Sequence, residues 1–474
     1  MPKNSVLSSE TELQDGIYEL TSRAAAPVSA RTDEADAKST KTMATVGGAA
    51  PLLGTSKAAS ASDGPVQAGN LEDHYPEGGI RAWLVVLGCW LALFTSLGFM
   101  HILATFQAYL SPAQQIQLRP GPVAGAIFGY ASLSLLLGIY VGPLFDKYGP
   151  RWLILAGTVC SVASLLFVSI GTEDWQLFVA LGILSSLGSA FLFTPAIAAV
   201  GHFFKDRRGF ATGVATTACS ASAVVFPFIL QALFVRVGWA WAMRALALIC
   251  FAITVAANFL IRARLPAARD ANPHPHGRVF RTKGFAATVL AVVLAQFASF
   301  LPLSYMSSYA LSKGFSEADS FNTVAILNAS SLVGRVVGGW SADKIGPFNV
   351  SAMLSAIAAL ACFGIWLPAG GTKAGITIFA VIFGCASGSS VSLVPVSVGR
   401  LCKTQEYGRY YGACYTVASL VSLFAIPAAE GVLREDLGSY WALIVVTGMF
   451  YVAAAATFVA TKLTVTGWRI WAAF

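Results

Sequence analysis

Long apolar segments recur through most of this chain and constrain its fold more than any other feature. Twelve can be read from the sequence, each close to the ~20 residues that an α-helix needs to cross a bilayer. Apolar residues make up 56% of the 474 positions and charged residues only 11%, which is more apolar surface than one soluble core needs. We therefore expect an all-α membrane protein with twelve transmembrane helices. The expected spans are residues 83–110, 122–142, 152–170, 175–200, 209–235, 239–262, 284–311, 317–341, 348–369, 374–399, 409–432 and 438–461.

A short loop motif occurs twice, roughly 200 residues apart. The first copy is GPLFDKYGPR, from Gly142 to Arg151, and the second is GGWSADKIG, from Gly338 to Gly346. One joins the second and third expected spans and the other joins the eighth and ninth, so the chain divides into two repeats of six spans. We expect two pseudo-symmetric six-helix bundles. Their ranges are 80–262 and 284–463, with a cytoplasmic inter-bundle loop at 263–283.

Residues 1–79 and 464–474 are the expected tails. The longer tail is rich in Ala, Ser, Thr and Gly and has few aromatic residues, so it is too polar to bury a core and is expected to be disordered. Its first residues lack the apolar stretch of a signal peptide, which predicts a cytoplasmic N-terminus. Basic residues are about three times as frequent in the loops that this topology places inside as in the opposite loops. We expect a multi-pass protein of the cell membrane with both termini cytoplasmic.

Several classes of function are disfavoured by the same sequence. The loop bias explains the net charge of +8, so no nucleic-acid partner is expected. The sequence has no phosphate-binding loop, dinucleotide fingerprint or metal-ligand spacing. Seven of the eight cysteines lie in apolar runs and no CxxC pair occurs. We expect no enzyme activity, no cofactor and no metal, and the sequence assigns no oligomeric state.

Seven separate segments of the chain share one resemblance. They are EGGIRAW, FQAYL, GPLFDKYGPR, FFKDRRGFATG, SSYALSKGFS, NASSLVGRVVGGWSADKIG and LCKTQEYGRYYGACYTVASL. Together they resemble the major facilitator superfamily of transporters and, within it, the monocarboxylate porter branch, especially its fungal members. The resemblance covers residues 77–463 and implies alternating access, in which two six-helix bundles rock about a central cavity.

The resemblance also gives the two loop motifs a role as a cytoplasmic gate. It implies that Asp146 and its repeat counterpart Asp343 each engage the end of a helix in the opposite half and help to hold the gate closed. The alternative interpretation of each motif is a tight solvated turn. The other expected gating residues are Gly142, Lys147, Gly149, Arg151, Lys344 and Gly346.

Arg335 is a charged residue within the eighth expected span. An arginine at the centre of a bilayer costs about 3 kcal/mol on insertion scales, so such a residue usually faces a polar cavity. Alternatively, its side chain extends to the interface a turn or two away. The resemblance favours the cavity, because monocarboxylate porters hold the substrate carboxylate with an Arg at this place. Animal members have an acidic residue tied to proton coupling one turn earlier; here it is Ser331, which argues against coupling through that pair.

His101, in the first expected span, stands where animal members have a substrate-binding Lys. Histidine changes charge near physiological pH, so it can bind an anion and carry its proton. The alternative is a neutral histidine that is hydrogen-bonded to a neighbouring helix. Four further side chains can orient a substrate or can instead satisfy neighbouring helix groups. They are Gln107, Tyr305, Tyr309 and Asn328.

The pattern as a whole predicts a secondary or facilitative transporter for a small organic acid or a related metabolite. Its expected partners are an organic-anion substrate, the lipid bilayer and protons. One alternative is an efflux pump that exports a fungal secondary metabolite. An alternative of a different class is a non-transporting nutrient receptor that signals through the N-terminal tail.

Overall fold

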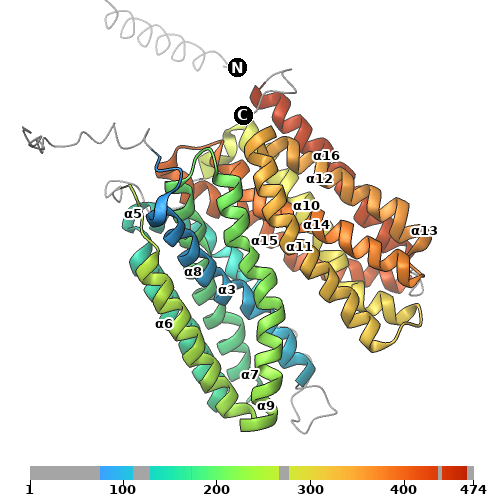
Figure 1. The fold of residues 1–474 in the computed structure, drawn as a ribbon, viewed down its shortest axis with the longest axis horizontal. Coiled ribbons are helices and arrows are strands. Elements are labelled where there is room, and N and C mark those ends of the chain that lie inside the picture. Colours follow the sequence, from blue (N-terminus) through green and yellow to red (C-terminus); the bar gives the residue numbers. More distant parts are fainter. Residues whose placement is uncertain (1–74, 110–128, 172, 266–276, 436–439, 467–474) are drawn as a thin grey trace, which may run out of the picture. The chain divides into compact units, whose positions relative to one another are not determined.

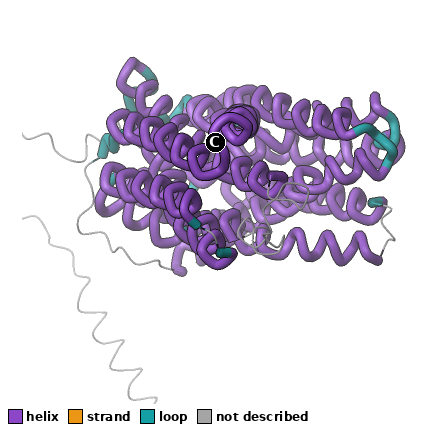
Figure 2. The backbone as a smooth tube through the Cα atoms, turned by 90° about the horizontal axis from the view of Figure 1, so that it is seen from below, coloured by secondary structure: helices purple, strands orange, loops and turns teal. Residues whose placement is uncertain are grey.

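The computed structural model describes residues 75–109, 129–171, 173–265, 277–435 and 440–466, and every regular element in these ranges is a helix (Figure 1). Short loops join the helices, as Figure 2 shows along the described chain. Nearly all of the expected N-terminal tail, much of the inter-bundle loop and most of the C-terminal tail lie outside the described residues.

The first half of the chain forms helices that cross the bundle from end to end. The longest, α9, runs from Arg208 to Leu260 over 53 residues, which at 1.5 Å per residue is more than twice the thickness of a bilayer core. Gly238 interrupts it with φ 73° and ψ 176°, a conformation that glycine adopts without steric cost, so α9 comprises the fifth and sixth expected spans. The other elements are α3 (Gly79–Tyr109), α5 (Gly138–Tyr148), α6 (Pro150–Ile170), α7 (Asp174–Leu177), η1 (Phe178–Leu184) and α8 (Ser185–Phe203).

The second half repeats this arrangement. After the 3-10 turn η2 (Gly277–Arg281), α10 begins at Lys283 and the chain ends its described part in α16. The elements are α10 (Lys283–Ser312), α11 (Glu317–Ile345), α12 (Pro347–Ala361), η3 (Cys362–Trp366), α13 (Leu367–Ala369), α14 (Lys373–Gly399), η4 (Thr404–Glu406), α15 (Tyr407–Glu435) and α16 (Trp441–Thr466).

Nine of the helical segments in the described part of the chain are long and apolar enough to cross a membrane, counting α9 once. Helices α11 and α15, of 29 residues each, are equally long but carry more polar residues. They pack against α9 and α5 of the other half, so protein covers part of their surface in place of lipid. With α9 read as two helices, the described part is consistent with the twelve expected spans.

One buried core includes most of the first half and continues into the second, and another core lies within the second half. Phe94 packs against Phe226 in the first core, with tilted rings and centroids 4.9 Å apart, and Trp366 stacks on Phe379 in the other at 4.7 Å. Large apolar side chains also point outward; Phe259 is 75% exposed and Trp152 is 72% exposed. An outer surface of this kind is stable when lipid covers it.

Candidate gate and substrate site

The two loop motifs fold into matching corners. Helix α5 ends at Gly149 and α11 ends at Gly346, with φ values of 76° and 91°, which a residue with a Cβ rarely adopts. A proline, Pro150 or Pro347, follows each glycine and begins the next helix, where its missing N–H leaves no bond unmade. The Gly-Pro pair therefore ends one helix and starts the next at both positions of the repeat.

Asp146, one turn before its glycine, reaches across to the other half of the chain. Its carboxylate accepts hydrogen bonds from the backbone N–H of Gly408 at 3.0 Å and of Arg409 at 2.9 Å. Both donors belong to the first turn of α15, where backbone N–H groups have no partner within the helix and the helix dipole favours a negative charge. Asp146 thus caps a helix that belongs to the opposite bundle, and it is 7% exposed.

Asp343 makes the reciprocal contact. It accepts hydrogen bonds from the N–H of Gly209 at 2.7 Å and of Phe210 at 2.8 Å, in the first turn of α9. The two aspartates therefore tie the bundles together twice, once in each direction, at the same end of the molecule, which we call the motif end. This geometry differs from a solvated turn, because the acceptors bind the other half and are not left to water.

Glycines allow the helices to approach this closely at the motif end. A Cβ on Gly142 would lie 2.1 Å from the carbonyl oxygen of Gly408, and one on Gly339 would lie 2.2 Å from that of Gly209. Real Cβ contacts are not this short, so the backbones of α5 and α15, and of α11 and α9, touch only because side chains are absent. The motif end is closed in this structure.

The basic residues of the motifs lie differently. Lys147 is half-buried with its ammonium 5.7 Å from the centroid of the Tyr148 ring, and Lys344 is exposed with its ammonium 3.8 Å from that of Trp340. The Arg151 side chain is exposed, and its backbone carbonyl accepts a hydrogen bond from Asn258. These contacts all stay within one half of the chain, whereas the aspartates bridge the two.

Arg335 is buried on α11, with 6% of its surface exposed, so its side chain does not extend to the interface. Its Nε donates to Ser331 Oγ at 3.4 Å, and Ser331 Oγ in turn receives a hydrogen bond from Ser220 of α9 at 3.5 Å. The Nη1 nitrogen of Arg335 is buried and has no hydrogen-bond partner among the described residues. A buried cationic donor without a partner costs free energy unless a ligand or another group satisfies it.

Two tyrosines of α15 and a phenylalanine of the other half form an aromatic group that was not expected from the sequence. The ring centroid of Tyr415 lies 4.9 Å from that of Tyr411 and 5.4 Å from that of Phe193. The two tyrosines stand one turn apart in the segment YGRYYGACY, so helical spacing gives the only signal that they share a face.

The other expected substrate residues do not all meet at Arg335. Asn328 donates to the carbonyl of Val324 in its own helix at 3.1 Å. Tyr309 is 3% exposed in the core of the second half, edge-on to Trp366 with ring centroids 5.5 Å apart. Tyr305 packs beside the same core.

The position of Tyr309 relative to Arg335 follows from a neighbouring contact. Ser307 on α10 hydrogen-bonds Ser320 near the start of α11 at 2.8 Å, so Tyr309 lies level with the beginning of that helix. Arg335 is 15 residues further along α11 than Ser320, about 22 Å at the rise of an α-helix. The structure therefore separates Tyr309 from Arg335. His101 and Gln107 lie on α3, but their side chains fall outside the described residues.

A second link at the motif end involves the segment before α3, whose sequence carried the family resemblance but no expected role. The Glu77 carboxylate accepts hydrogen bonds from the backbone N–H groups of Lys205, Asp206 and Arg207 at 2.7, 2.9 and 3.1 Å. Tyr75, two residues earlier, hydrogen-bonds Thr404 of the other half through its hydroxyl group. Nothing in the sequence signals these partners, which lie more than 120 residues away.

No cluster of three or more His, Cys, Asp or Glu suited to a metal occurs in the part of the chain that the structure describes. The arrangement presents a buried cationic donor at Arg335 and holds the two halves together at one end.

Comparison with known proteins places these features in a family. Residues 82–426 match the family model described as Major Facilitator Superfamily. The chain is 33% identical over 398 residues to an MFS-type transporter of Ophiocordyceps sp. (strain BCC 1869), covering 83% of this chain and 88% of that protein. It is 32% identical over 418 residues to the fujikurins efflux protein of Gibberella fujikuroi (strain CBS 195.34 / IMI 58289 / NRRL A-6831), covering 84% and 86%. The structure resembles the Escherichia coli fucose:proton symporter with a TM-score of 0.64 at 17% identity, over 80% of this chain and 98% of that one.

Proposed function

Because the chain belongs to the major facilitator superfamily, whose members are transporters and not enzymes, we propose that it moves a small organic acid, or a related metabolite that carries an acidic group, by alternating access. The substrate class rests mainly on one observation. Arg335 is buried between the halves with an unpartnered Nη1. A planar guanidinium is shaped to bind a carboxylate through two parallel hydrogen bonds.

The position of Arg335 between the halves also supports a substrate site there. Ser220 of α9, in the first half, hydrogen-bonds Ser331, which also accepts a hydrogen bond from Arg335, so the site lies where the two halves meet. A site between the halves is where a rocking motion changes access from one side to the other. His101 on α3 remains our second candidate for contact with the substrate or its proton.

The resemblance to monocarboxylate porters gives the finer assignment. That branch uses an Arg at this place of the eighth span, which supports a monocarboxylate-like substrate here. Ser331 stands in place of the acidic partner, so protons, if they are coupled, use another group. A relative that is named as an efflux protein supports export of a fungal secondary metabolite as the second candidate.

The closed motif end gives alternating access a physical basis. Asp146 and Asp343 hold the halves together by capping α15 and α9, and opening that end requires both carboxylates to give up two backbone N–H groups each. We propose that the motif end faces the cytoplasm of the cell membrane, with both termini on that side, because the basic loops lie there. Substrate or ion gradients then supply the energy.

A substitution that keeps the charge of Arg335 tests the proposal. Arg335→Lys retains a cation but loses the two-pronged geometry, so flux of a carboxylate should fall about 10- to 100-fold. Purified protein in liposomes would be assayed for uptake of a panel of labelled monocarboxylates and of uncharged analogues of the same size. Arg281→Lys, at an exposed position in η2, is the matched control. Equal flux through the Arg335→Lys protein and the wild type would contradict the assigned role.

A further inference from the structure

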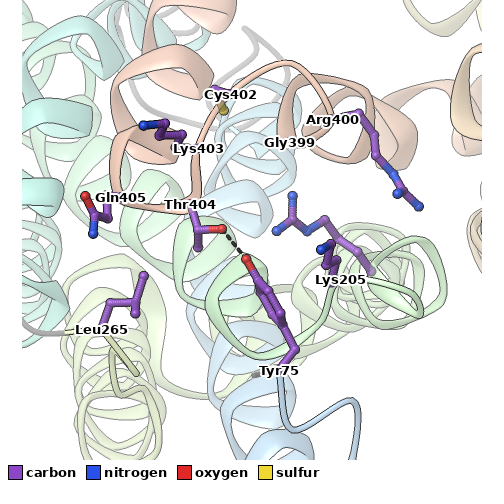
Figure 3. A pocket seen from close by; sticks show the side chains of 10 residues that line it. Tyr75, Lys205, Leu265, Gly399, Arg400, Cys402, Lys403, Thr404 and Gln405 are labelled. Atoms are coloured by element: carbon purple, nitrogen blue, oxygen red, sulfur yellow. Dashed lines mark hydrogen bonds between the residues drawn. The ribbon is translucent and has the colours of Figure 1, made fainter. Parts of the chain in front are cut away.

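A basic pocket of about 400 Å³ opens at the motif end, close to the gate but separate from Arg335 (Figure 3). Residues from both halves line it: Tyr75, Lys205 and Arg208 from the first, and Arg400, Lys403 and Thr404 from the second. Figure 3 shows Lys205 and Arg400 on the same side of the pocket, with the Tyr75–Thr404 hydrogen bond beside them. Four of these side chains are cations.

Both arginines of the pocket have side-chain N–H donors without a hydrogen-bond partner among the described residues. Arg208 is 5% exposed; its Nε and Nη2 donate to the carbonyls of Phe204 and Gly201 at 3.0 and 2.7 Å, and its Nη1 has no partner among the described residues. The Arg400 side chain makes no hydrogen bond or salt bridge within the described part of the chain, whereas its backbone N–H donates to Ser397. Burial lowers the pKa of the Arg400 guanidinium, and the positive charge of Arg208 lowers it further. These are the surroundings of a cation that lacks a counter-ion.

Carboxylates nearby do not neutralise the pocket. Asp206, Asp343 and Glu77 act on Arg400 only at longer range, and their effect is smaller than that of burial. Glu77 and Asp343 are already bound to backbone N–H groups at the starts of the loop and of α9. Glu406 lies 4.0 Å from Arg409 and forms no salt bridge with the four lining cations in the described part of the chain.

Several backbone donors near the pocket are already engaged. The N–H groups of the Lys205–Arg207 loop point to Glu77, and those in the first turns of α9 and α15 point to Asp343 and Asp146. The charged donors that a ligand in the pocket meets are the four cationic side chains. Two guanidinium and two ammonium groups suit an anion that carries more than one negative charge and several acceptor oxygens.

The packing around Arg208 fixes this pocket between the halves. Its guanidinium carbon lies 5.0 Å from the centroid of the Tyr407 ring in the other half. A Cβ on Gly399 would lie 1.9 Å from Arg208 Nη1, so only glycine leaves room for the arginine at this position. Tyr75 completes the wall, with Lys205 and Arg264 at 5.6 and 4.8 Å from its ring centroid.

We propose that this pocket binds a phosphate group, carried by a soluble phosphorylated compound or by a lipid head group, and that the bound phosphate holds the motif end closed. A phosphate ester carries up to two negative charges and three acceptor oxygens, which matches four cations better than one carboxylate does. A ligand that contacts Lys205 and Arg208 on one half and Arg400 and Lys403 on the other stabilises the state in which the halves touch.

Thermal unfolding of the purified full-length protein tests binding without any transported substrate. In detergent, inorganic pyrophosphate should raise the Tm in a saturable way, and sodium acetate at matched ionic strength should not. The variants Arg400→Gln and Lys403→Gln should each weaken pyrophosphate binding at least about tenfold. Arg281→Gln, at an exposed position that does not line the pocket, should bind like the wild type. Lys403 is exposed, so its variant stays informative if Arg400→Gln does not fold.

A second experiment distinguishes a soluble phosphorylated ligand from a lipid head group. The Tm is measured in nanodiscs of phosphatidylcholine with or without a phosphoinositide. A pyrophosphate effect that depends on Arg400 and Lys403 supports a soluble ligand. A rise in Tm with the phosphoinositide that depends on Arg400 and Lys403, when pyrophosphate causes no rise, supports a lipid head group. The proposal would be overturned if acetate raised the Tm as much as pyrophosphate does, or if both pocket variants were stabilised as much as the wild type. It would also be overturned if neither pyrophosphate nor the phosphoinositide changed the Tm. None of these outcomes bears on Arg335, so they leave the proposed transport function untouched.

Discussion

Replacing Asp146 by Asn should open the motif end. Asp146 accepts two backbone N–H groups, one on each carboxylate oxygen, at 3.0 and 2.9 Å. An amide has a single acceptor oxygen, so Asp146→Asn loses one hydrogen bond to a charged group, about 1.5–3 kcal/mol. It also loses the favourable interaction of the charge with the start of α15, about 0.3–1 kcal/mol. The closed state should be destabilised by about 2–4 kcal/mol, a change of about 30- to 1,000-fold in the ratio of closed to open molecules.

The change can be measured as a distance between the two halves. Spin labels would replace Tyr148 in the first half and Ile345 in the second, which are 55% and 41% exposed at the motif end, in a cysteine-free background. Asp146→Asn should add a population with a longer distance. Asp319→Asn is the control, because Asp319 bonds Lys373 at 2.6 Å within the second half and does not join the bundles. A distance distribution in Asp146→Asn that matches the wild type would refute the assigned role of the cap.

Two further changes at the motif end have defined outcomes. Gly339→Ala would put a Cβ 2.2 Å from the carbonyl oxygen of Gly209, a clash that costs about 1–3 kcal/mol, and should lengthen the same spin-label distance. The control is Gly364→Ala, which should leave the distance unchanged because no atom lies within 4 Å of the added Cβ. A Gly339→Ala protein with the wild-type distance would show that the close contact is not needed to keep the motif end closed. Glu77→Gln should release the Lys205–Arg207 loop and speed its cleavage by trypsin about three- to tenfold. Glu317→Gln, an exposed acid of α11, should cleave at the wild-type rate, and equal rates in both variants would contradict a tethering role for Glu77.

Much of the fold could be predicted because lipid imposes simple rules on sequence. A span needs about 20 apolar residues, and this length is visible without any knowledge of packing. The ends of two spans were placed too early, at residues 142 and 341, because α5 and α11 continue to Tyr148 and Ile345, where a glycine and a proline end one helix and begin the next. The duplication of the motif then gave the division into two halves.

The contacts between the two halves could not be predicted from the residues themselves. A carboxylate near a helix end is compatible with many partners, and only the family resemblance pointed Asp146 and Asp343 toward the opposite bundle. The sequence left Arg335 between two orientations, because a long side chain one or two turns from an interface can reach either environment. Packing of α11 against α9 resolves this, and α9 is more than 70 residues away from Arg335 in the chain.

The basic pocket likewise could not be predicted from the sequence. From the sequence, the four lining cations were interpreted only as loop charges that determine the membrane topology. That interpretation does not predict that they line a common pocket. The residues are Lys205, Arg208, Arg400 and Lys403. Their convergence depends on two loops that are separated by nearly 200 residues of sequence and that occupy equivalent places in the two repeats. Glu77 and Tyr75 contribute from a third segment, whose short length before α3 gave no hint of a structural role.

Metabolite profiling of the native host tests the central claim, transport of an acidic metabolite through Arg335, most directly. Cells and medium would be compared by mass spectrometry among the wild type, a deletion strain and a strain carrying Arg335→Lys at normal protein abundance. The account predicts that one carboxylic acid is retained inside the deletion strain, or left unconsumed in its medium, and that Arg335→Lys reproduces the change. A deletion that alters no acidic metabolite, or an Arg335→Lys strain that matches the wild type, would contradict it.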